Sequence, residues 1–449
     1  MNDIAVFRVW HGLPIPLRLV IGLAVLVAFG TALLLGVDRG LAWNEALFTT
    51  VSALTVTGLS VIVPGRDLTG AGQLVLLLLI QLGGMGFMVL AVVILNLLGW
   101  QVRIENRVAL RDSLGLNNVG EIVRLMRLSV QVLLIIELIG ALCLFLHWRT
   151  FVPLSEGQIL WYALFHAVSA MCNAGFELFT GLPAFPGGPP MDTLTLAILC
   201  MLIFLGGIGI PVISNVVQLP KNGRLRLHVK IALAMSVFLI VAGAAAILLA
   251  EGRPGGVLSS EPSPWRRIVL AMAQSISART AGFAWLPNFD QMTASTRFVL
   301  MALMFIGASP ASMGGGIKTV TFAVLLLSLY SQARRIPDVI LLRRTIGVRN
   351  VQKAAAVLTA ALLVVCGATW LLALTQNVSL DRALFEVISA FATCGLTLAL
   401  TFELDLFGQM LIMFIMFWGR LGALTVVAAV APPRRRTAVS FPEDEVLIG

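Results

Sequence analysis

Charged residues are scarce in this sequence. Aspartate, glutamate, lysine and arginine make up only 12% of the 449 residues, while 59% are hydrophobic. Soluble globular domains carry charge on roughly a quarter of their residues. The composition therefore excludes an ordinary soluble domain and predicts a membrane protein that crosses the bilayer several times.

Cysteine and histidine are also scarce, which argues against a zinc site, a disulfide framework or an enzyme. The five cysteines show no CxxC spacing and lie in apolar segments. The four histidines are scattered, and no nucleophile–base pair or metal cluster is recognisable, so a membrane enzyme is disfavoured. No glycine-rich nucleotide-binding segment follows a strand, so we expect no cofactor on this chain. No cleavable signal peptide is evident, because the first apolar run lacks a clear small-residue cleavage site.

What the chain does contain is one pattern repeated four times. The segments read LFTTVSALTVTGL, LFHAVSAMCNAGF, LAMAQSISARTAGF and LFEVISAFATCGL, and their glycines are Gly58, Gly175, Gly282 and Gly395. The glycines are separated by 117, 107 and 113 residues, which is about a quarter of the chain each time. We therefore predict four copies of one unit, over residues 1–100, 101–220, 221–336 and 337–431, and a C-terminal tail at 432–449.

Each predicted unit has the same order of segments. A long apolar span comes first, at residues 17–37, 122–147, 228–250 and 353–375. A shorter run follows, at 43–54, 157–171, 265–278 and 380–391, and a second long span completes the unit, at 72–98, 193–217, 297–329 and 409–431. About 20 helical residues cross the hydrocarbon core, so the short runs are predicted to be re-entrant pore helices. The expected fold is all-α, with eight transmembrane spans in four helix–pore helix–filter loop–helix units around a pseudo-fourfold axis. Four surface-lying loops are the weaker alternative.

The distribution of basic residues predicts the orientation. The N-terminus, the loops between units and the C-terminal tail hold 20 of the 31 lysines and arginines. Positive charge favours the cytoplasmic side, so both termini and the loops between units are expected in the cytoplasm, and the glycine segments open outward. This distribution also explains the net charge of +9 without nucleic acid. The loops at 103–127 and 334–353 are candidates for binding anionic lipid or a soluble partner, although setting topology alone would account for each single residue.

The glycine segments are the candidate ion site. A dehydrated cation needs oxygen ligands, and backbone carbonyls supply them in potassium channels. Glycine allows positive φ beside the ion path, and the C-terminal ends of pore helices favour a cation. The candidate filter residues are Val56, Thr57, Gly58, Asn173, Ala174, Gly175, Thr280, Ala281, Gly282, Thr393, Cys394 and Gly395, with K⁺ expected at their carbonyls.

A second candidate site lies in the third unit, where the span is overlong and reads GASPASMGGGIKT. Proline and successive glycines break helices, so we predict two half-helices joined by an intramembrane loop. Gly314, Gly315, Gly316 and Lys318 of this loop, with Arg420 half-way along the last span, are predicted to form a gate. The simpler alternative is that Arg420 only bonds the free carbonyls of the broken helix.

Three further charges lie near the glycine segments. Arg279 would repel a cation, so we expect it to turn behind the filter and brace backbone carbonyls or a carboxylate. Glu177 and Glu403 follow filter glycines and either attract cations at the pore mouth or are simply solvated.

These motifs together resemble those of the Trk/Ktr/HKT superfamily of potassium transporters, and most of all its bacterial KtrB membrane subunits. The resemblance rests on the four glycine units, on SMGGGIKT, on FWGRLGA around Arg420 and on the terminal EVLIG. It implies that the four glycines form a potassium filter, that 307–318 is a gating loop, and that glycine rather than serine in the first segment favours potassium over sodium. It also implies a homodimer with one pore in each protomer, regulated by a cytoplasmic ring of nucleotide-binding RCK subunits.

The favoured function is therefore gated, channel-like potassium uptake. A sodium-permeable or sodium-coupled transporter of the same architecture is the alternative. An alternating-access carrier is less expected, because such carriers usually show two large inverted repeats, whereas here four parallel units recur.

Overall fold

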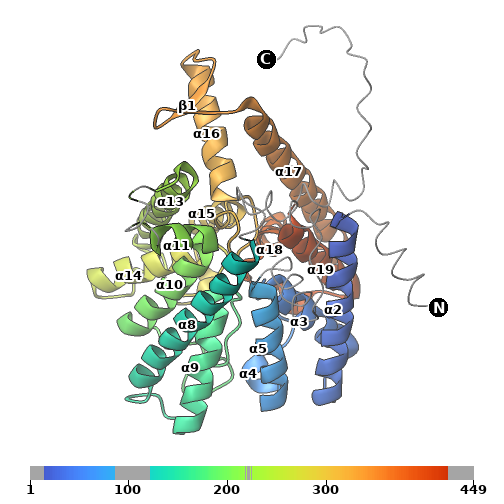
Figure 1. The fold of residues 1–449 in the computed structure, drawn as a ribbon. Coiled ribbons are helices and arrows are strands. Elements are labelled where there is room, and N and C mark those ends of the chain that lie inside the picture. Colours follow the sequence, from blue (N-terminus) through green and yellow to red (C-terminus); the bar gives the residue numbers. More distant parts are fainter. Residues whose placement is uncertain (1–14, 86–121, 218, 220–222, 224, 423–449) are drawn as a thin grey trace, which may run out of the picture.

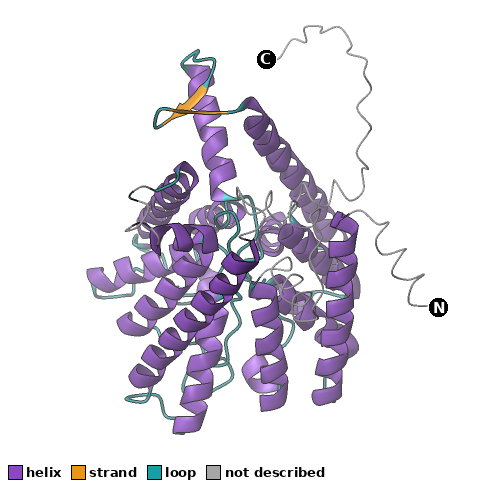
Figure 2. Ribbon diagram, viewed as in Figure 1, coloured by secondary structure: helices purple, strands orange, loops and turns teal. Residues whose placement is uncertain are grey.

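The computed structural model describes residues 15–85, 122–217, 219, 223 and 225–422. The regular secondary structure of the described chain is helical, apart from one short hairpin (Figure 2). The predicted tail at 432–449 and most of the 103–127 loop lie outside the described residues.

Four long helices match the predicted first spans. They are α2 (Ile15–Val37), α8 (Ile122–Trp148), α13 (Leu227–Glu251) and α17 (Val348–Gln376), and each is long and apolar enough to cross a membrane. Large apolar side chains on them are exposed, including Phe29 at 62%, Leu138 at 66% and Leu363 at 70%. A face of this kind is stable in lipid rather than in water.

Four short helices lie inside the long ones and match the predicted pore helices to within one residue at each end. They are α3 (Trp43–Thr55), α9 (Glu156–Met171), α14 (Pro264–Ser277) and α18 (Leu380–Ala392). Local sequence explains where they start: Ser155 caps α9 with Gln158, and Ser263 precedes a proline at the first position of α14. Their C-terminal halves are mostly buried, and those of α3 and α18 are buried completely.

Two of the predicted second spans, at 193–217 and 297–329, are interrupted, and the structure describes only the first part of the other two. The described parts are α5 (Gly70–Gly84), α10 (Thr193–Ile208), α11 (Ile210–Val217), α15 (Ala294–Phe305), α16 (Thr319–Ala333) and α19 (Leu406–Leu421). None of these reaches the length of a full span. The break between α15 and α16 confirms the predicted interruption in the third unit.

The break between α10 and α11 was not predicted. Gly209 has a φ of +85° and a ψ of 150°, which no right-handed helix accommodates. The expectation of an unbroken helix at 193–217 is therefore wrong. Residues 86–98 and 423–431 of the first and last second spans lie outside the described residues.

The short helices pack in a closed circular order. Each contacts the long helix that precedes it, in the pairs α2–α3, α8–α9, α13–α14 and α17–α18. Each also contacts the second helix of another predicted unit, in the pairs α5–α9, α10–α14, α15–α18 and α19–α3. Because α19 returns to α3, the first and last quarters of the chain are neighbours, and the C-terminal ends of all four short helices are brought to one centre.

The remaining elements are small. Single turns are found at α4 (Pro64–Asp67), η1 (Phe289–Gln291) and η2 (Leu400–Glu403). Strands β1 (Val339–Leu341) and β2 (Arg344–Ile346) form an antiparallel hairpin whose two turn residues, Leu342 and Arg343, both have positive φ. Figure 1 shows this hairpin at the far end of α16, beyond the rest of the fold. It departs from the all-α expectation.

Candidate functional site

The four repeat glycines meet in a closed ring, which we call the glycine ring. A Cβ atom on Gly58 would collide with the carbonyl oxygen of Ala174, and one on Gly175 would lie 2.8 Å from that of Ala281. A Cβ on Gly282 would collide with the carbonyl oxygen of Cys394, and one on Gly395 with that of Thr57. Each glycine therefore touches the carbonyl that precedes the next glycine, and the fourth closes on the first. No side chain fits at these positions.

The backbone on either side of each ring carbonyl is left-handed. The ring glycines have φ of +88°, +70°, +81° and +97° in chain order. Two residues earlier in each segment, the non-glycine residues Val56, Asn173, Thr280 and Thr393 have φ of +57°, +56°, +74° and +50°. Left-handed backbone at β-branched residues is strained, and strain of this kind gathers at functional sites. All eight residues are among the twelve filter candidates predicted from the sequence, and the structure brings the four segments together.

The ring is the chemical centre of the site. The carbonyls of Thr57, Ala174, Ala281 and Cys394 converge on it, and all four residues are buried. Within the described residues, no group of three or more His, Cys, Asp or Glu side chains could hold a metal ion. Backbone carbonyl oxygens are the cation ligands that this centre offers.

Four buried serines support the ring, and the sequence analysis missed them. Ser52 and Ser389 accept hydrogen bonds from the ring amides of Gly58 and Gly395, at 3.0 and 3.1 Å. Ser169 and Ser277 instead donate to the carbonyls of Phe176 and Phe283, just after the other two ring glycines. The signal was present, because a serine stands five or six residues before each ring glycine. These hydroxyls fix the ring peptides in place.

The glycines of the second helices have a packing role. A Cβ on Gly83, Gly206 or Gly419 would collide with the last-turn carbonyls of Leu54, Met171 and Phe391, respectively. The missing side chains let these helices press against the C-terminal ends of the short helices. Those ends are thereby held around the ring, with their partial negative charge directed at it.

The 306–318 loop lies against the ring segments. The amide of Gly315 donates to Thr393 Oγ1 at 2.9 Å, and a Cβ on Gly314 would collide with Thr280 Oγ1. The loop is also tied to α10, because Ser309 N donates to Gly207 O at 3.0 Å and Met313 N to Gly206 O at 3.2 Å. Gly316, with a φ of +69°, turns the chain back towards α16.

Two cations hold this loop. The Arg420 guanidinium donates to the carbonyls of Met313 and Gly83, which joins the loop to α19 and α5. The Lys318 ammonium donates back to Gly314 O within the loop. Arg420 lies in the last turn of the described α19, where the helix dipole favours a cation, and the rest of the predicted span, at 423–431, lies outside the described residues.

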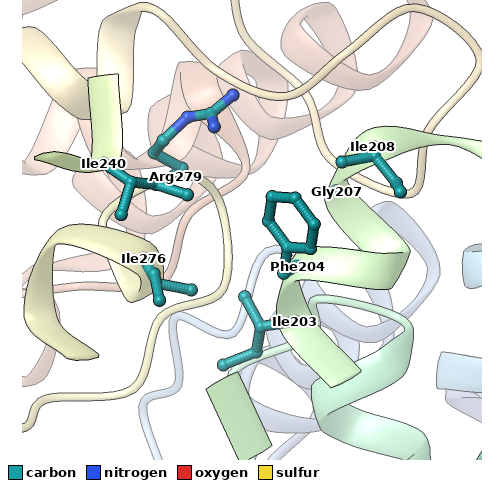
Figure 3. Close-up of a pocket in the computed structure, with 7 residues that line it drawn as sticks. All are labelled: Ile203, Phe204, Gly207, Ile208, Ile240, Ile276 and Arg279. Atoms are coloured by element: carbon teal, nitrogen blue, oxygen red, sulfur yellow. The ribbon is translucent and has the colours of Figure 1, made fainter. Parts of the chain in front are cut away.

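Arg279 braces the wall behind the ring, as expected from the sequence. Its guanidinium donates to Ser236 O at 3.3 Å and to Gly307 O at 3.2 Å, and the residue is only 7% exposed. Figure 3 shows its stem beside Ile240, with the guanidinium directed away from Ile203 and Ile276. The cavity there measures about 10 Å³, which is about the space that one water molecule needs. It is far too small for an organic substrate.

A buried carboxylate behind the second ring segment was also missed. Glu137 on α8 accepts a hydrogen bond from Gln81 Nε2 at 3.1 Å, and Cys172 Sγ lies 3.6 Å from its other oxygen. Cys172 is the C-cap of α9 and directly precedes Asn173. A lone glutamate in an apolar span gives a sequence signal, but nothing in the sequence shows which neighbour it meets.

The two outer carboxylates are neither free nor simply solvated. Glu177 accepts hydrogen bonds from the amides of Phe179 and Thr180, at 2.7 and 2.9 Å, and burial raises its pKa. Glu403 pairs with Arg382 at 2.8 Å, and this hydrogen bond lowers the pKa of Glu403. Both therefore stabilise outer loops, and an exposed pair such as Glu403–Arg382 contributes about 0–1 kcal/mol.

Comparison with known proteins agrees with this geometry. Residues 20–436 match the TrkH family, described as cation transport proteins. The chain is 36% identical to "Ktr system potassium uptake protein B" of Vibrio alginolyticus, over 91% of this chain and 89% of that protein. It is 34% identical to the protein of the same name from Bacillus subtilis, over 98% of each.

A further relative and a solved structure extend the comparison. "Potassium/sodium uptake protein NtpJ" of Enterococcus hirae is 29% identical over 95% of this chain and 96% of its own length. The crystal structure of the potassium transporter TrkH from Vibrio parahaemolyticus shares the fold, with a TM-score of 0.69 at 20% identity, covering 92% of this chain and 85% of that one. This chain belongs to the TrkH family of cation transport proteins.

Proposed function

We propose that this protein takes up potassium through a gated, channel-like pore in the bacterial cytoplasmic membrane. The observation that carries the proposal is the glycine ring, in which each glycine abuts the carbonyl before the next. The names of the relatives support potassium as the ion. The pore then runs along a pseudo-fourfold axis through four units, with eight spans and both termini in the cytoplasm.

The ring acts as the selectivity filter in this proposal. The carbonyls of Thr57, Ala174, Ala281 and Cys394 replace the water shell of K⁺, and the short helices direct their negative ends at the same point. Uptake is driven by the membrane potential, which contributes about 2.3 kcal/mol per charge per 100 mV. The site uses no cofactor, because the ion moves without a chemical step.

The 306–318 loop acts as the gate. It lies beside the ring segments and is pinned by Arg420, so an ion leaving the ring meets it next. Opening requires the Arg420 bonds to Met313 and Gly83 to break. The name "Ktr system" given to relatives supports a further subunit as partner. The proposed assembly is a homodimer with one pore in each protomer, controlled by a cytoplasmic ring of nucleotide-binding RCK subunits.

Flux into liposomes that hold the purified chain alone tests the proposal. We expect entry of K⁺ and Rb⁺ but little Na⁺, and loss of this preference in Gly58→Ser, whose side chain would displace Ala174. Equal entry of Na⁺ and K⁺ would favour the sodium-permeable alternative. No cation entry in the native chain and in Arg420→Gln would contradict a pore altogether.

A further inference from the structure

A groove opens between α13, α16 and α17, away from the glycine ring. Its volume is about 330 Å³, within the range of roughly 300–1,000 Å³ for ligand pockets. The lining residues used below are Leu227, His228 and Ile231 of α13, Val324 of α16, and Lys353 and Val357 of α17.

The groove is lined by basic and apolar side chains, and its basic end lies where α13 and α17 begin. His228 and Lys353 lie near the first residues of these two helices. One turn further along each helix, Ile231 and Val357 also line the groove. Helix α16, which begins after the 306–318 loop, contributes Val320, Thr321 and Val324.

Charge in and around the groove is of one sign. No acidic side chain is among the lining residues, and Lys353 is exposed at the mouth. Arg226, Lys230 and Arg349 are exposed on the same first turns of α13 and α17 or next to them. This end of the groove therefore favours an anion, while the apolar side chains of the lining favour hydrocarbon.

The helices that line the groove indicate where its ligand comes from. Helices α13 and α17 are both long and apolar enough to span a membrane. A groove between such helices is reached from the bilayer, and its basic end lies on the side that positive charge assigns to the cytoplasm. Basic pockets between transmembrane helices on that side suit anionic lipid headgroups.

We propose that this groove binds one anionic phospholipid of the cytoplasmic leaflet. The headgroup phosphate meets Lys353 and His228, and an acyl chain lies along Ile231, Val324 and Val357. The site is independent of potassium conduction. Helix α16 follows Lys318 directly, and the bound chain would pack against its first two turns.

Native mass spectrometry of the full-length protein tests this proposal without measuring flux. The probes are phosphatidylglycerol and phosphatidylcholine with identical acyl chains. We expect one phosphatidylglycerol per chain to be retained in preference to phosphatidylcholine. Lys353→Gln should lower this preference about fivefold, as expected for one charge at an anionic headgroup, and Val324→Trp should abolish retention by filling the apolar end.

Two controls keep the test decisive. Arg253→Gln removes an exposed charge beyond the other end of α13 and should leave the preference unchanged. Thermal melting in detergent without lipid verifies that both groove variants fold. An unchanged preference in Lys353→Gln and Val324→Trp would overturn the proposal, as would an equal loss in Arg253→Gln. Displacement of the lipid by millimolar glycerol phosphate would also overturn it, since it would identify a site for free anions.

Discussion

Replacing Gly175 with alanine changes one hydrogen for one methyl group at the centre of the proposed filter. The new Cβ would lie 2.8 Å from Ala281 O and 3.0 Å from the Cα of Gly282. Carbon–oxygen contacts normally start at about 3.3 Å. The ring must therefore open by roughly 0.5 Å at this point, and the displaced atom is a proposed ion ligand.

The free-energy cost of the Gly175→Ala substitution has two separable parts. A left-handed φ of +70° costs alanine about 1–2 kcal/mol wherever it occurs. Overpacking a tight site adds about 1–3 kcal/mol. If this second part falls on the ion-bound state, K⁺ flux decreases by roughly 5- to 150-fold. The substitution Gly255→Ala isolates the cost of left-handed backbone, because Gly255 has a φ of +90° and nothing lies within 4 Å of an added Cβ.

The assay is ⁸⁶Rb⁺ uptake into liposomes holding equal amounts of the native chain, Gly175→Ala or Gly255→Ala. Both variants should show similar losses of thermal stability, but only Gly175→Ala should lose flux. Native flux in Gly175→Ala would refute the assignment of the ring as the ion path. An equal loss of flux in Gly255→Ala would show that backbone strain alone is responsible.

Three further variants test the parts around the ring. Arg420→Gln removes two charge-assisted hydrogen bonds, each worth about 1.5–3 kcal/mol, and should raise basal flux about tenfold or more. The flux of Arg420→Lys should lie between that of Arg420→Gln and that of the native chain. Lower flux in both variants would contradict a gate that Arg420 holds closed. Thr393→Val removes the acceptor of the Gly315 amide and should raise flux about two- to tenfold, whereas Thr393→Ser, which keeps the hydroxyl, should not. Glu137→Leu should lower the K⁺/Na⁺ flux ratio, because Cys172 loses its partner. Glu137→Gln can still accept a hydrogen bond from Gln81 and should retain most of the native ratio. Identical flux ratios in the two variants would mean that Glu137 does not support the ring.

Sequence periodicity predicted the long and short helices well. Helices α3 and α18 match their predicted bounds closely because an apolar run, a polar start and a glycine segment mark each one. The repeats also predicted which residues meet, since four like segments in one membrane layer are most simply arranged around a common centre. The ring at Gly58, Gly175, Gly282 and Gly395 follows from that reasoning.

The features that sequence reasoning missed depend on contacts between distant segments. The left-handed break at Gly209 is set by the close approach of Pro310 O and Ala311 O, at 2.9 and 3.1 Å from an added Cβ. The sequence of an apolar span does not show which distant backbone atoms will lie next to one of its glycines. The pairing of Glu137 with Gln81 joins α8 to α5 and depends on tertiary packing.

The contacts of Arg420 could not be predicted for a similar reason. Hydropathy continues past Leu421, so the sequence shows one long apolar segment. The structure places Gly422 at a φ of +84°, and the described α19 ends just before it. From this last turn Arg420 reaches the carbonyls of Met313 and Gly83, which belong to distant segments of the chain.

The most direct test of the account is to locate Rb⁺ by anomalous diffraction in crystals grown with Rb⁺ in place of K⁺. The account predicts an anomalous peak at the centre of the glycine ring, coordinated by the carbonyls of Thr57, Ala174, Ala281 and Cys394. Absence of a peak there, in a preparation that takes up Rb⁺ into liposomes, would contradict the claim that the ring carbonyls coordinate the transported ion.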